Sequence, residues 1–207
     1  MTCWKNPIKA IIFDNDGTFL DTLGSYVKAS NIILGSPMSQ DFYNSINGMD
    51  AKTVSAKIVA EYKLDMTAEE FLSKRDAIVN KLLLNSKPFP GVVELAQKFK
   101  KKGYKIGLAT SADAEKTRIK FSNQPDILNI FDVVITSSDV TKAKPDPEIF
   151  IKCAEKLGNF EPSNVLVFED AMNGVKAAKE AGMASAFFAN GNNDCEKLFS
   201  KFGCSPS

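Results

Sequence analysis

The chain has 207 residues, of which 44% are hydrophobic and 25% charged, and its formal net charge is +1. This composition is typical of a soluble globular protein, and the balanced charge does not favour a nucleic-acid partner. The sequence contains no histidine, which excludes Ser-His-Asp catalysis, Cys-His catalysis and histidine-bound zinc. Any chemistry must therefore depend on carboxylates, lysines, hydroxyl groups and a hard metal ion.

Two further features of the sequence bear on location. No segment approaches the roughly 20 consecutive apolar residues that span a membrane, and the N-terminus has no secretory signal pattern. The 4 cysteines include no CxxC pair, so neither a zinc ribbon nor a disulfide framework is indicated. We expect a cytoplasmic monomer with reduced thiols and without a membrane partner.

The first predicted element is a buried strand over residues 8–14, which is rich in β-branched and aromatic side chains. It ends in the acidic turn Asp14-Asn15-Asp16-Gly17. A helix-rich insertion follows over residues 22–86, and within it Thr67 and Glu70 have the capping-box spacing that begins a helix. Two prolines and a glycine in residues 87–91 mark the end of the insertion.

The rest of the chain alternates between strands and helices. Further strands are expected over residues 104–111, 131–138, 164–170 and 184–189. Before the third of these, Asp146 is placed as the N-cap of a helix, Pro147 as its first residue and Gly158 just beyond its end.

This alternation predicts an α/β fold with a doubly wound, Rossmann-like parallel sheet. The core domain is expected over residues 1–21 and 87–207, and residues 22–86 are expected to form an inserted α-helical cap domain.

Polar residues gather where the predicted strands end. The first strand ends with Asp14 and Asp16 at its turn, the second ends with Thr110 and Ser111, the third leads into Lys142 and Lys144, and the fourth ends with Glu169 and Asp170. An acidic turn alone is more often a solvated loop. Doubly wound sheets, however, bind ligands beyond the carboxyl ends of their strands, and so the convergence predicts a functional site.

The chemistry of this set can be read from its groups. Several carboxylates without histidine suit Mg²⁺, which prefers oxygen ligands. A lysine and hydroxyl groups beside Mg²⁺ form a phosphate-binding arrangement. An aspartate can attack phosphorus, and a second acid two positions along the chain can exchange protons with the leaving group and with water. Asp14 and Asp16 have this spacing.

Four segments resemble, in order and spacing, the motifs of the haloacid dehalogenase (HAD) superfamily: FDNDGTFLDT, LATSA, KAKPDPEIF and VLVFEDAMNGVKAAKEAGM. The resemblance covers nearly the whole predicted core. The DxDGT form is that of the phosphatase and phosphomutase members, which depend on Mg²⁺, and the insertion is similar to a type-1 helical cap. The segments look most like the branch of pseudouridine-5′-phosphatase, sugar-phosphate phosphatases and β-phosphoglucomutase.

The resemblance implies catalytic roles for four matching residues. Asp14 would be the nucleophile and a Mg²⁺ ligand. Asp16 would be the general acid/base and would bind the metal through its backbone carbonyl. Thr110 would bind phosphate through its hydroxyl group, and Lys144 would pair with phosphate and with Asp14.

The resemblance also assigns metal and substrate contacts. Asp170 would bind Mg²⁺, and Glu169 would bind it directly or hold a metal-bound water. Candidates for contact with phosphate or substrate are Gly17, Ser111 and Asn173 in the core, and Gly48 and Lys52 in the insertion. The sequence departs from the family at Asn15, where an apolar residue usually separates the two acids.

Two other interpretations remain open. β-Phosphoglucomutase shares the cap type, but its family uses a cap-hinge histidine near the position of Tyr26, and this chain has no histidine. A non-catalytic protein of the same fold is disfavoured because the set of acids, lysine and threonine is intact. The expected activity is Mg²⁺-dependent hydrolysis of a small phosphate monoester, a sugar phosphate or nucleotide-like metabolite, through an aspartyl-phosphate.

Overall fold

The computed structural model describes residues 7–46, 49 and 51–188 of the chain. The chain divides into two compact units. The sheet unit extends to Asp21 and resumes at Ser86, and the helical unit spans Thr22–Asn85.

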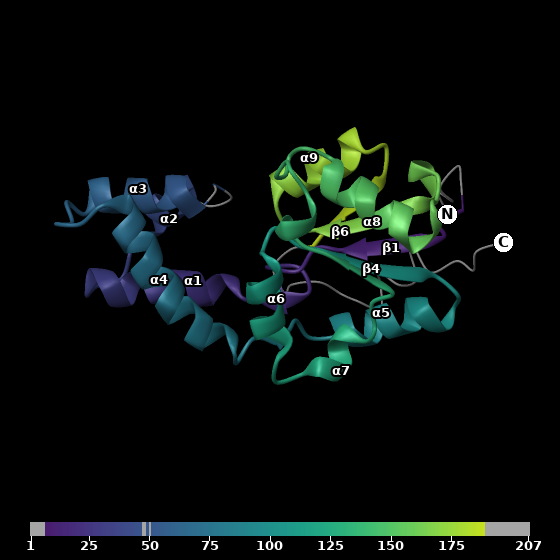
Figure 1. Ribbon diagram of the computed structural model, residues 1–207, viewed down its shortest axis with the longest axis horizontal. Helices are drawn as coiled ribbons and strands as arrows, with labels where there is room; N and C mark the ends of the chain where they lie inside the picture. The colour runs from purple at the N-terminus through teal and green to yellow at the C-terminus, as the bar shows by residue number, and fades with distance from the viewer. Residues whose placement is uncertain (1–6, 47–48, 50, 189–207) are drawn as a thin grey trace. The chain divides into compact units, whose positions relative to one another are not determined.

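The sheet unit is built on five parallel strands in the order β5-β4-β1-β6-β7 (Figure 1). Their bounds are Ala10–Phe13 for β1, Lys105–Ala109 for β4, Val133–Ile135 for β5, Val165–Glu169 for β6 and Ala184–Phe187 for β7. The predicted α/β fold with a doubly wound parallel sheet is confirmed. β1 lies in the middle, with β4 and β6 on its two sides. In sheets of this type, ligands bind beyond the carboxyl ends of the strands where the strand order reverses, which is at β1 here.

Alternate residues of the central strand face two different helical layers. Ile11 and Phe13 pack with the helices α5 (Val92–Lys101), α6 (Ala114–Phe121) and α7 (Pro125–Leu128). Ala10 and Ile12 pack with α8 (Glu148–Gly158) and α9 (Met172–Glu180). Figure 1 shows these two layers on opposite faces of the sheet. A strand covered on both faces is apolar at every position, which explains the unbroken run AIIF.

An aromatic cluster fixes the first of these layers. The ring of Phe13 stacks on Phe168 of β6 at 5.0 Å between centroids and meets Phe19 edge-on at 5.6 Å. Such pairs contribute about 0.5–1.5 kcal/mol each beyond the area they bury. The cluster therefore holds the end of β1 rigidly just before the acidic turn.

A second, two-stranded antiparallel sheet stands where the insertion begins and ends. It pairs β2 (Leu20–Asp21) with β3 (Lys87–Pro88). The amide of Phe89 also donates to the carbonyl of Phe19 at 3.0 Å. These contacts bring the two ends of the insertion together within the sheet unit.

The helical unit consists of α1 (Leu23–Leu34), α2 (Gln40–Ile46), α3 (Ala51–Glu61) and α4 (Ala68–Leu83). Its core is centred on Ile46, Ile58 and Phe71. The predicted capping box is confirmed, since the Thr67 hydroxyl accepts from the Glu70 amide at 3.1 Å and a Glu70 carboxylate oxygen accepts from the Thr67 amide at 2.8 Å.

The predicted ends of α8 are wrong by one residue. The N-cap is Pro147, not Asp146, and the C-cap is Asn159, which has the left-handed φ of 53°. Asparagine tolerates this conformation, and Gly158 before it already has a φ of 151°, so the helix ends over these two residues. Asp146 still contributes, because its Oδ1 accepts from the Glu148 amide at 3.0 Å.

Within the described ranges, no helix combines the length and the apolar character needed to cross a membrane. The expected cytoplasmic location and monomeric state stay predictions.

Candidate active site

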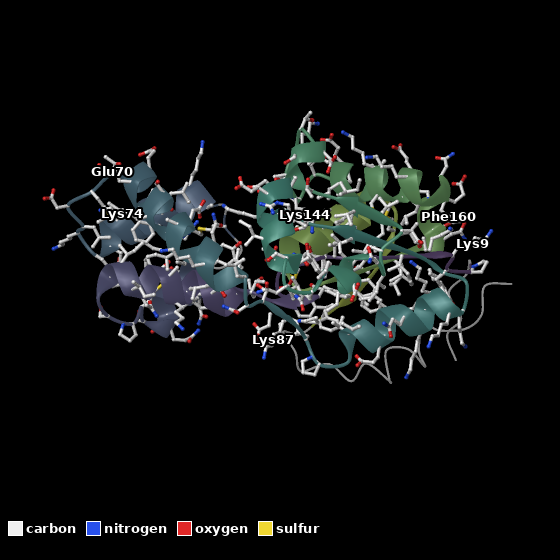
Figure 2. All side chains as sticks on the ribbon, turned by 60° about the horizontal axis from the view of Figure 1, so that its bottom comes forward. Lys9, Glu70, Lys74, Lys87, Lys144 and Phe160 are labelled. Atoms are coloured by element: carbon white, nitrogen blue, oxygen red, sulfur yellow. The ribbon has the colours of Figure 1, made fainter. Side chains whose placement is uncertain are left out.

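The site forms at the carboxyl edge of the parallel sheet. Phe13, the last residue of β1, is in register with Leu108 of β4 and Phe168 of β6. Asp14 directly follows β1, and its amide donates to the Phe168 carbonyl at 2.9 Å. Figure 2 shows Lys144 at the opposite end of the sheet unit from Lys9, which precedes β1. The strand ends thus bring together residues that are far apart in sequence.

Lys144 links the ends of three strands, β1, β4 and β6. Its ammonium lies 2.5 Å from Oδ1 of Asp14 and 2.8 Å from Oε1 of Glu169, and it reaches the Ala109 carbonyl at 3.4 Å. The ammonium also lies 4.7 Å from the centre of the Phe150 ring. The side chain is only 7% exposed, so its charge is held in place by contacts on several sides.

Burial and mutual charge shift the acid–base equilibria here. Burial raises the pKa of Asp14 well above its usual value; the Lys144 ammonium acts against this, and the carboxylates of Glu169 and Asp170 add to it. For Lys144, burial favours the neutral form, but Asp14 and Glu169 outweigh it and raise the pKa above its usual value. Lys144 is therefore a fixed cation beside carboxylates that repel each other.

Asp170 completes the acidic group. Burial and the Glu169 carboxylate raise its pKa to about 6, although a hydrogen bond from Thr18 works in the opposite direction. That bond runs from the Thr18 hydroxyl to Oδ1 of Asp170 at 2.9 Å. An aspartate with such a pKa gains strongly from a nearby positive charge.

Asp14, Glu169 and Asp170 can together surround a cation. Each offers a carboxylate oxygen, and these oxygens all lie within 4.8 Å of one another. All three ligands are oxygens, which suits Mg²⁺. Burial raises the pKa values of Asp14 and Asp170, and neighbouring carboxylates add to this, so a divalent cation at the cluster would stabilise the ionised forms of both side chains.

Asp16 belongs to a second group beside the first. Its Oδ2 accepts from the Thr110 hydroxyl at 3.3 Å, and both of its carboxylate oxygens lie 2.6 Å from the ammonium of Lys120. Thr110 follows β4 and Lys120 belongs to α6. The two aspartates of the acidic turn are therefore paired with different lysines.

The remaining predicted residues differ in where they lie. Gly17 is buried with φ of 91°, a left-handed value that favours glycine, and its amide donates to the Leu20 carbonyl at 3.0 Å. Ser111 and Asn173 are exposed at the same edge of the sheet unit, after β4 and in the first turn of α9. Lys52 is exposed on α3 of the helical unit, and Gly48 lies outside the described residues.

Lys142, the other lysine of the third loop, does not join the acidic group. Its ammonium lies 3.4 Å from Oδ2 of Asp146, and its side chain is 71% exposed. Asn15 is fully buried, and its amide nitrogen approaches Oδ2 of Asp16 at 3.5 Å. Its Oδ1 has no hydrogen-bond partner among the described residues.

Sequence reasoning missed three residues of the site: Thr18, Lys120 and Gly174. The spacing of Thr117, Lys120 and Phe121 places them on one face of α6, but only the structure shows that this face, with Lys120 in it, is buried. Gly174 lies inside a helix, where glycine needs a packing reason. That reason is Glu169, whose Oε1 would lie 1.7 Å from a Cβ at position 174.

With this geometry in place, the comparisons with known proteins identify the class. The chain belongs to the family of haloacid dehalogenase-like hydrolases, whose pattern matches residues 11–188. This range includes the acidic turn, Lys120, Lys144 and the Glu169-Asp170 pair. The enzyme class predicted from the four motifs is confirmed.

Particular relatives narrow the comparison. A phosphorylated carbohydrates phosphatase of Thermotoga maritima is 32% identical over 183 residues, which cover 85% of this chain and 82% of that protein. A Drosophila melanogaster protein named as a probable pseudouridine-5′-phosphatase is 31% identical over 179 residues, which cover 83% of this chain and 78% of the relative. A solved structure from T. maritima, provisionally named a β-phosphoglucomutase, has a TM-score of 0.75 at 30% identity and covers 94% of this chain and 92% of its own.

Proposed function

We propose that this protein is a Mg²⁺-dependent phosphatase that hydrolyses a small phosphate monoester through an aspartyl-phosphate on Asp14. The observation that carries the proposal is the placement of Asp14 at the carboxyl edge of the sheet, 2.5 Å from the buried ammonium of Lys144 and grouped with Glu169 and Asp170. This placement combines a nucleophile, a lysine ammonium that can bind the phosphoryl oxygens and a group of carboxylates that can bind a metal ion.

Asp14 and Asp170 would hold the metal, together with the backbone carbonyl of Asp16. Glu169 would act mainly by orienting its neighbours, since its Oε1 accepts from Lys144 at 2.8 Å and its Oε2 from the Ala171 amide at 2.7 Å. When bound, Mg²⁺ would neutralise charge on the phosphoryl oxygens and so lower the barrier to attack by a carboxylate.

The protein's own residues account for both chemical steps. In the first, a carboxylate oxygen of Asp14 bonds to phosphorus, the ester P–O bond breaks, and the leaving oxygen takes a proton from Asp16. In the second, water attacks phosphorus, Asp16 takes a proton from that water, and the bond between phosphorus and Asp14 breaks. Asp16 regains in the second step the proton that it lost in the first, so each turnover restores both residues.

Thr110 and Lys144 would bind the phosphate during these steps. The Thr110 hydroxyl is buried and already lies 3.3 Å from the Asp16 carboxylate. The raised pKa of Lys144 keeps it charged throughout turnover. Gly17, Ser111 and Asn173 stand at the same edge as candidates for further phosphate contacts.

We infer the substrate class from the relatives. They are named for phosphorylated carbohydrates and for pseudouridine-5′-phosphate. The substrate proposed here is therefore a phosphorylated sugar or a nucleotide-like monoester. The helical unit, residues 22–85, would serve as the cap that selects it, with Lys52 and Gly48 as candidate contacts.

A phosphomutase is the alternative, suggested by the provisional name of the T. maritima structure. Hydrolysis is preferred because the mutase family relies on a histidine and this chain has none. The two activities can be told apart by experiment. A mutase needs a sugar bisphosphate and releases no inorganic phosphate, whereas a phosphatase releases inorganic phosphate.

The test is a screen of sugar phosphates, nucleoside monophosphates and polyol phosphates with Mg²⁺, with inorganic phosphate as the readout. Asp14→Asn should lower hydrolysis of p-nitrophenyl phosphate by at least about 10³-fold, because the nucleophile is lost. Circular dichroism should show an unchanged fold.

Asp126→Asn is the matched control, since Asp126 is an exposed carboxylate on α7 of the same unit. It should keep the wild-type rate. Full activity in Asp14→Asn would overturn the mechanism, and dependence on glucose-1,6-bisphosphate without phosphate release would favour the mutase.

A further inference from the structure

We propose that Lys120 is a positioning residue for catalysis: it fixes the carboxylate of Asp16 so that this acid/base meets the leaving oxygen and then the attacking water. The inference rests on the proposed function, because it gives Asp16 a partner within the same reaction. It concerns a lysine that lies outside the four motifs, 104 residues along the chain from Asp16.

The burial of Lys120 indicates that its ammonium depends on the ion pair with Asp16. The side chain is 0% exposed, whereas that of Asp16 is 21% exposed. A lysine buried without a partner is very unfavourable, and an ion pair tolerates burial only with close geometry. Within the described part of the chain, Asp16 supplies the ion-pair contact of the Lys120 ammonium, at 2.6 Å from each carboxylate oxygen.

The backbone of Lys120 is anchored as well. α6 begins at the N-cap Asp113, whose Oδ1 accepts from the Lys116 amide at 2.7 Å. Near its other end, the Gln124 side-chain amide approaches the Lys120 carbonyl at 3.4 Å and the Ser86 carbonyl at 3.0 Å. The ammonium is therefore presented to Asp16 from a helix fixed at both ends.

The geometry around Asp16 gives the pair a catalytic meaning. Thr110, the proposed phosphate contact, donates to Oδ2 of Asp16 at 3.3 Å, and Lys120 contacts the same oxygen at 2.6 Å. Two donors, one just after β4 and one on α6, thus converge on one carboxylate and restrict its rotation. A general acid/base works only within hydrogen-bond reach of its proton, so a fixed position adds directly to the rate.

Lys120 and Lys144 divide the site between them. Lys144 contacts Asp14, Glu169 and the Ala109 carbonyl, on the side of the nucleophile and the cation cluster. Lys120 contacts Asp16. Packing alone would be served by an apolar side chain at position 120, without the cost of burying an ammonium.

The experiment is a double-mutant cycle of Asp16→Asn and Lys120→Met on the full chain. Lys120→Met should lower kcat for an alkyl phosphate such as glycerol phosphate by about 10²-fold, with KM nearly unchanged, because only a transition-state interaction is lost. In the Asp16→Asn background, Lys120→Met should change kcat by no more than about twofold, since Lys120 acts through Asp16.

A second readout separates positioning from a structural role. The p-nitrophenolate leaving group needs little protonation, so Lys120→Met should release one equivalent of it per enzyme in a burst and then turn over slowly, as phosphoenzyme awaits an oriented base. Lys120→Gln keeps a hydrogen-bond donor and should recover part of the lost rate. If Lys120 only packs, Met should be at least as active as Gln.

Thermal unfolding is measured for every variant, and Arg118→Met, an exposed cation on the same helix, should keep wild-type kinetics. Equal losses from Lys120→Met in both backgrounds would overturn the inference while leaving the phosphatase mechanism standing. Full activity of Asp14→Asn would overturn both. Coupled losses in kcat, a burst and partial rescue by Gln would establish the role of Lys120.

Discussion

The two units of the molecule bury different kinds of residue. The helical unit has an apolar centre in Ile46, Ile58 and Phe71, and the charged residue that it buries, Arg75, lies on α4 rather than in a cluster of carboxylates. The carboxyl edge of the sheet unit instead buries charge: Lys120 is 0% exposed and Glu169 2%. Buried charge costs stability unless every partner is in place. The comparison teaches that the sheet unit gives up stability at its edge to hold reactive groups, while the helical unit is stabilised by ordinary packing.

The cost at the edge is offset inside the same unit. The aromatic cluster of Phe13, Phe19, Phe168 and their neighbours lies directly under the acidic turn. Each fully buried aromatic side chain contributes roughly 1.5–3 kcal/mol by removal of apolar surface from water. Changes in the helical unit should therefore affect stability first, and changes at the edge should affect activity first.

The largest expected effect on stability comes from Phe71→Ala in the helical unit. Phe71 is 0% exposed, and its loss leaves a cavity that should cost about 3–5 kcal/mol. Hydrogen exchange followed by mass spectrometry should show faster exchange in α3 and α4, with β1 and β6 still protected. Equal loss of protection in both units would show that they unfold together, which contradicts the comparison.

At the edge of the sheet unit, Gly174→Ala should act on activity as well as stability. A Cβ at this position would lie 1.7 Å from Oε1 and 2.0 Å from Cδ of Glu169. Glu169 must then move away from Lys144, with a stability loss of about 1–3 kcal/mol from overpacking. Activity should fall about 10–100-fold because the supporting contacts of the cation cluster are lost. Steady-state kinetics and thermal unfolding check both effects, and unchanged activity would show that Glu169 does not support the cluster.

The sequence was sufficient for the fold and for half of this edge. Strands and helices are encoded locally, and the parallel alternation then determines which strand ends share an edge. Asp14, Glu169 and Asp170 stand at the ends of predicted strands and Lys144 in the loop that follows another, so their proximity could be predicted.

The other half of the edge depends on contacts between distant segments. Lys120 meets Asp16 across 104 positions, and Thr18 meets Asp170 across 152. A lysine on a helix is usually solvated, and only the packing of α6 against the sheet makes Lys120 buried. The fit of Gly174 around Glu169 is likewise a property of the folded backbone.

A smaller effect is expected from the pH dependence of cation binding. The pKa of Asp170 is raised to about 6 by burial and by Glu169. The folded state therefore binds more protons than the unfolded state between the unfolded pKa near 3.8 and about 6, and the metal-free protein should lose stability as pH rises through this window. After allowance for solvent screening, the loss should be about 1 kcal/mol.

At pH values above the Asp170 pKa of about 6, where this carboxylate is ionised, Mg²⁺ should restore the lost stability. Thermal unfolding with Mg²⁺ and with EDTA should show a larger stabilisation by Mg²⁺ at about pH 7.5 than at about pH 5, because a ligand must be deprotonated to bind a metal. Asp170→Asn should remove the difference. The same stabilisation at both pH values would exclude Asp170 as the titrating ligand.

The smallest effect is expected from Gly24→Ala in the helical unit, which is the matched counterpart of Gly174→Ala in the sheet unit. Gly24 lies in α1 of the helical unit, and a Cβ there would meet nothing within 4 Å. Gly24→Ala should therefore stabilise the protein by up to about 1 kcal/mol, since alanine is the better helix former, and should leave kcat with p-nitrophenyl phosphate unchanged. The same chemical change, one methyl group, is thus expected to stabilise at position 24 and to damage activity at position 174. If Gly24→Ala impaired hydrolysis as strongly as Gly174→Ala, the division between a packing unit and a reactive edge would be wrong.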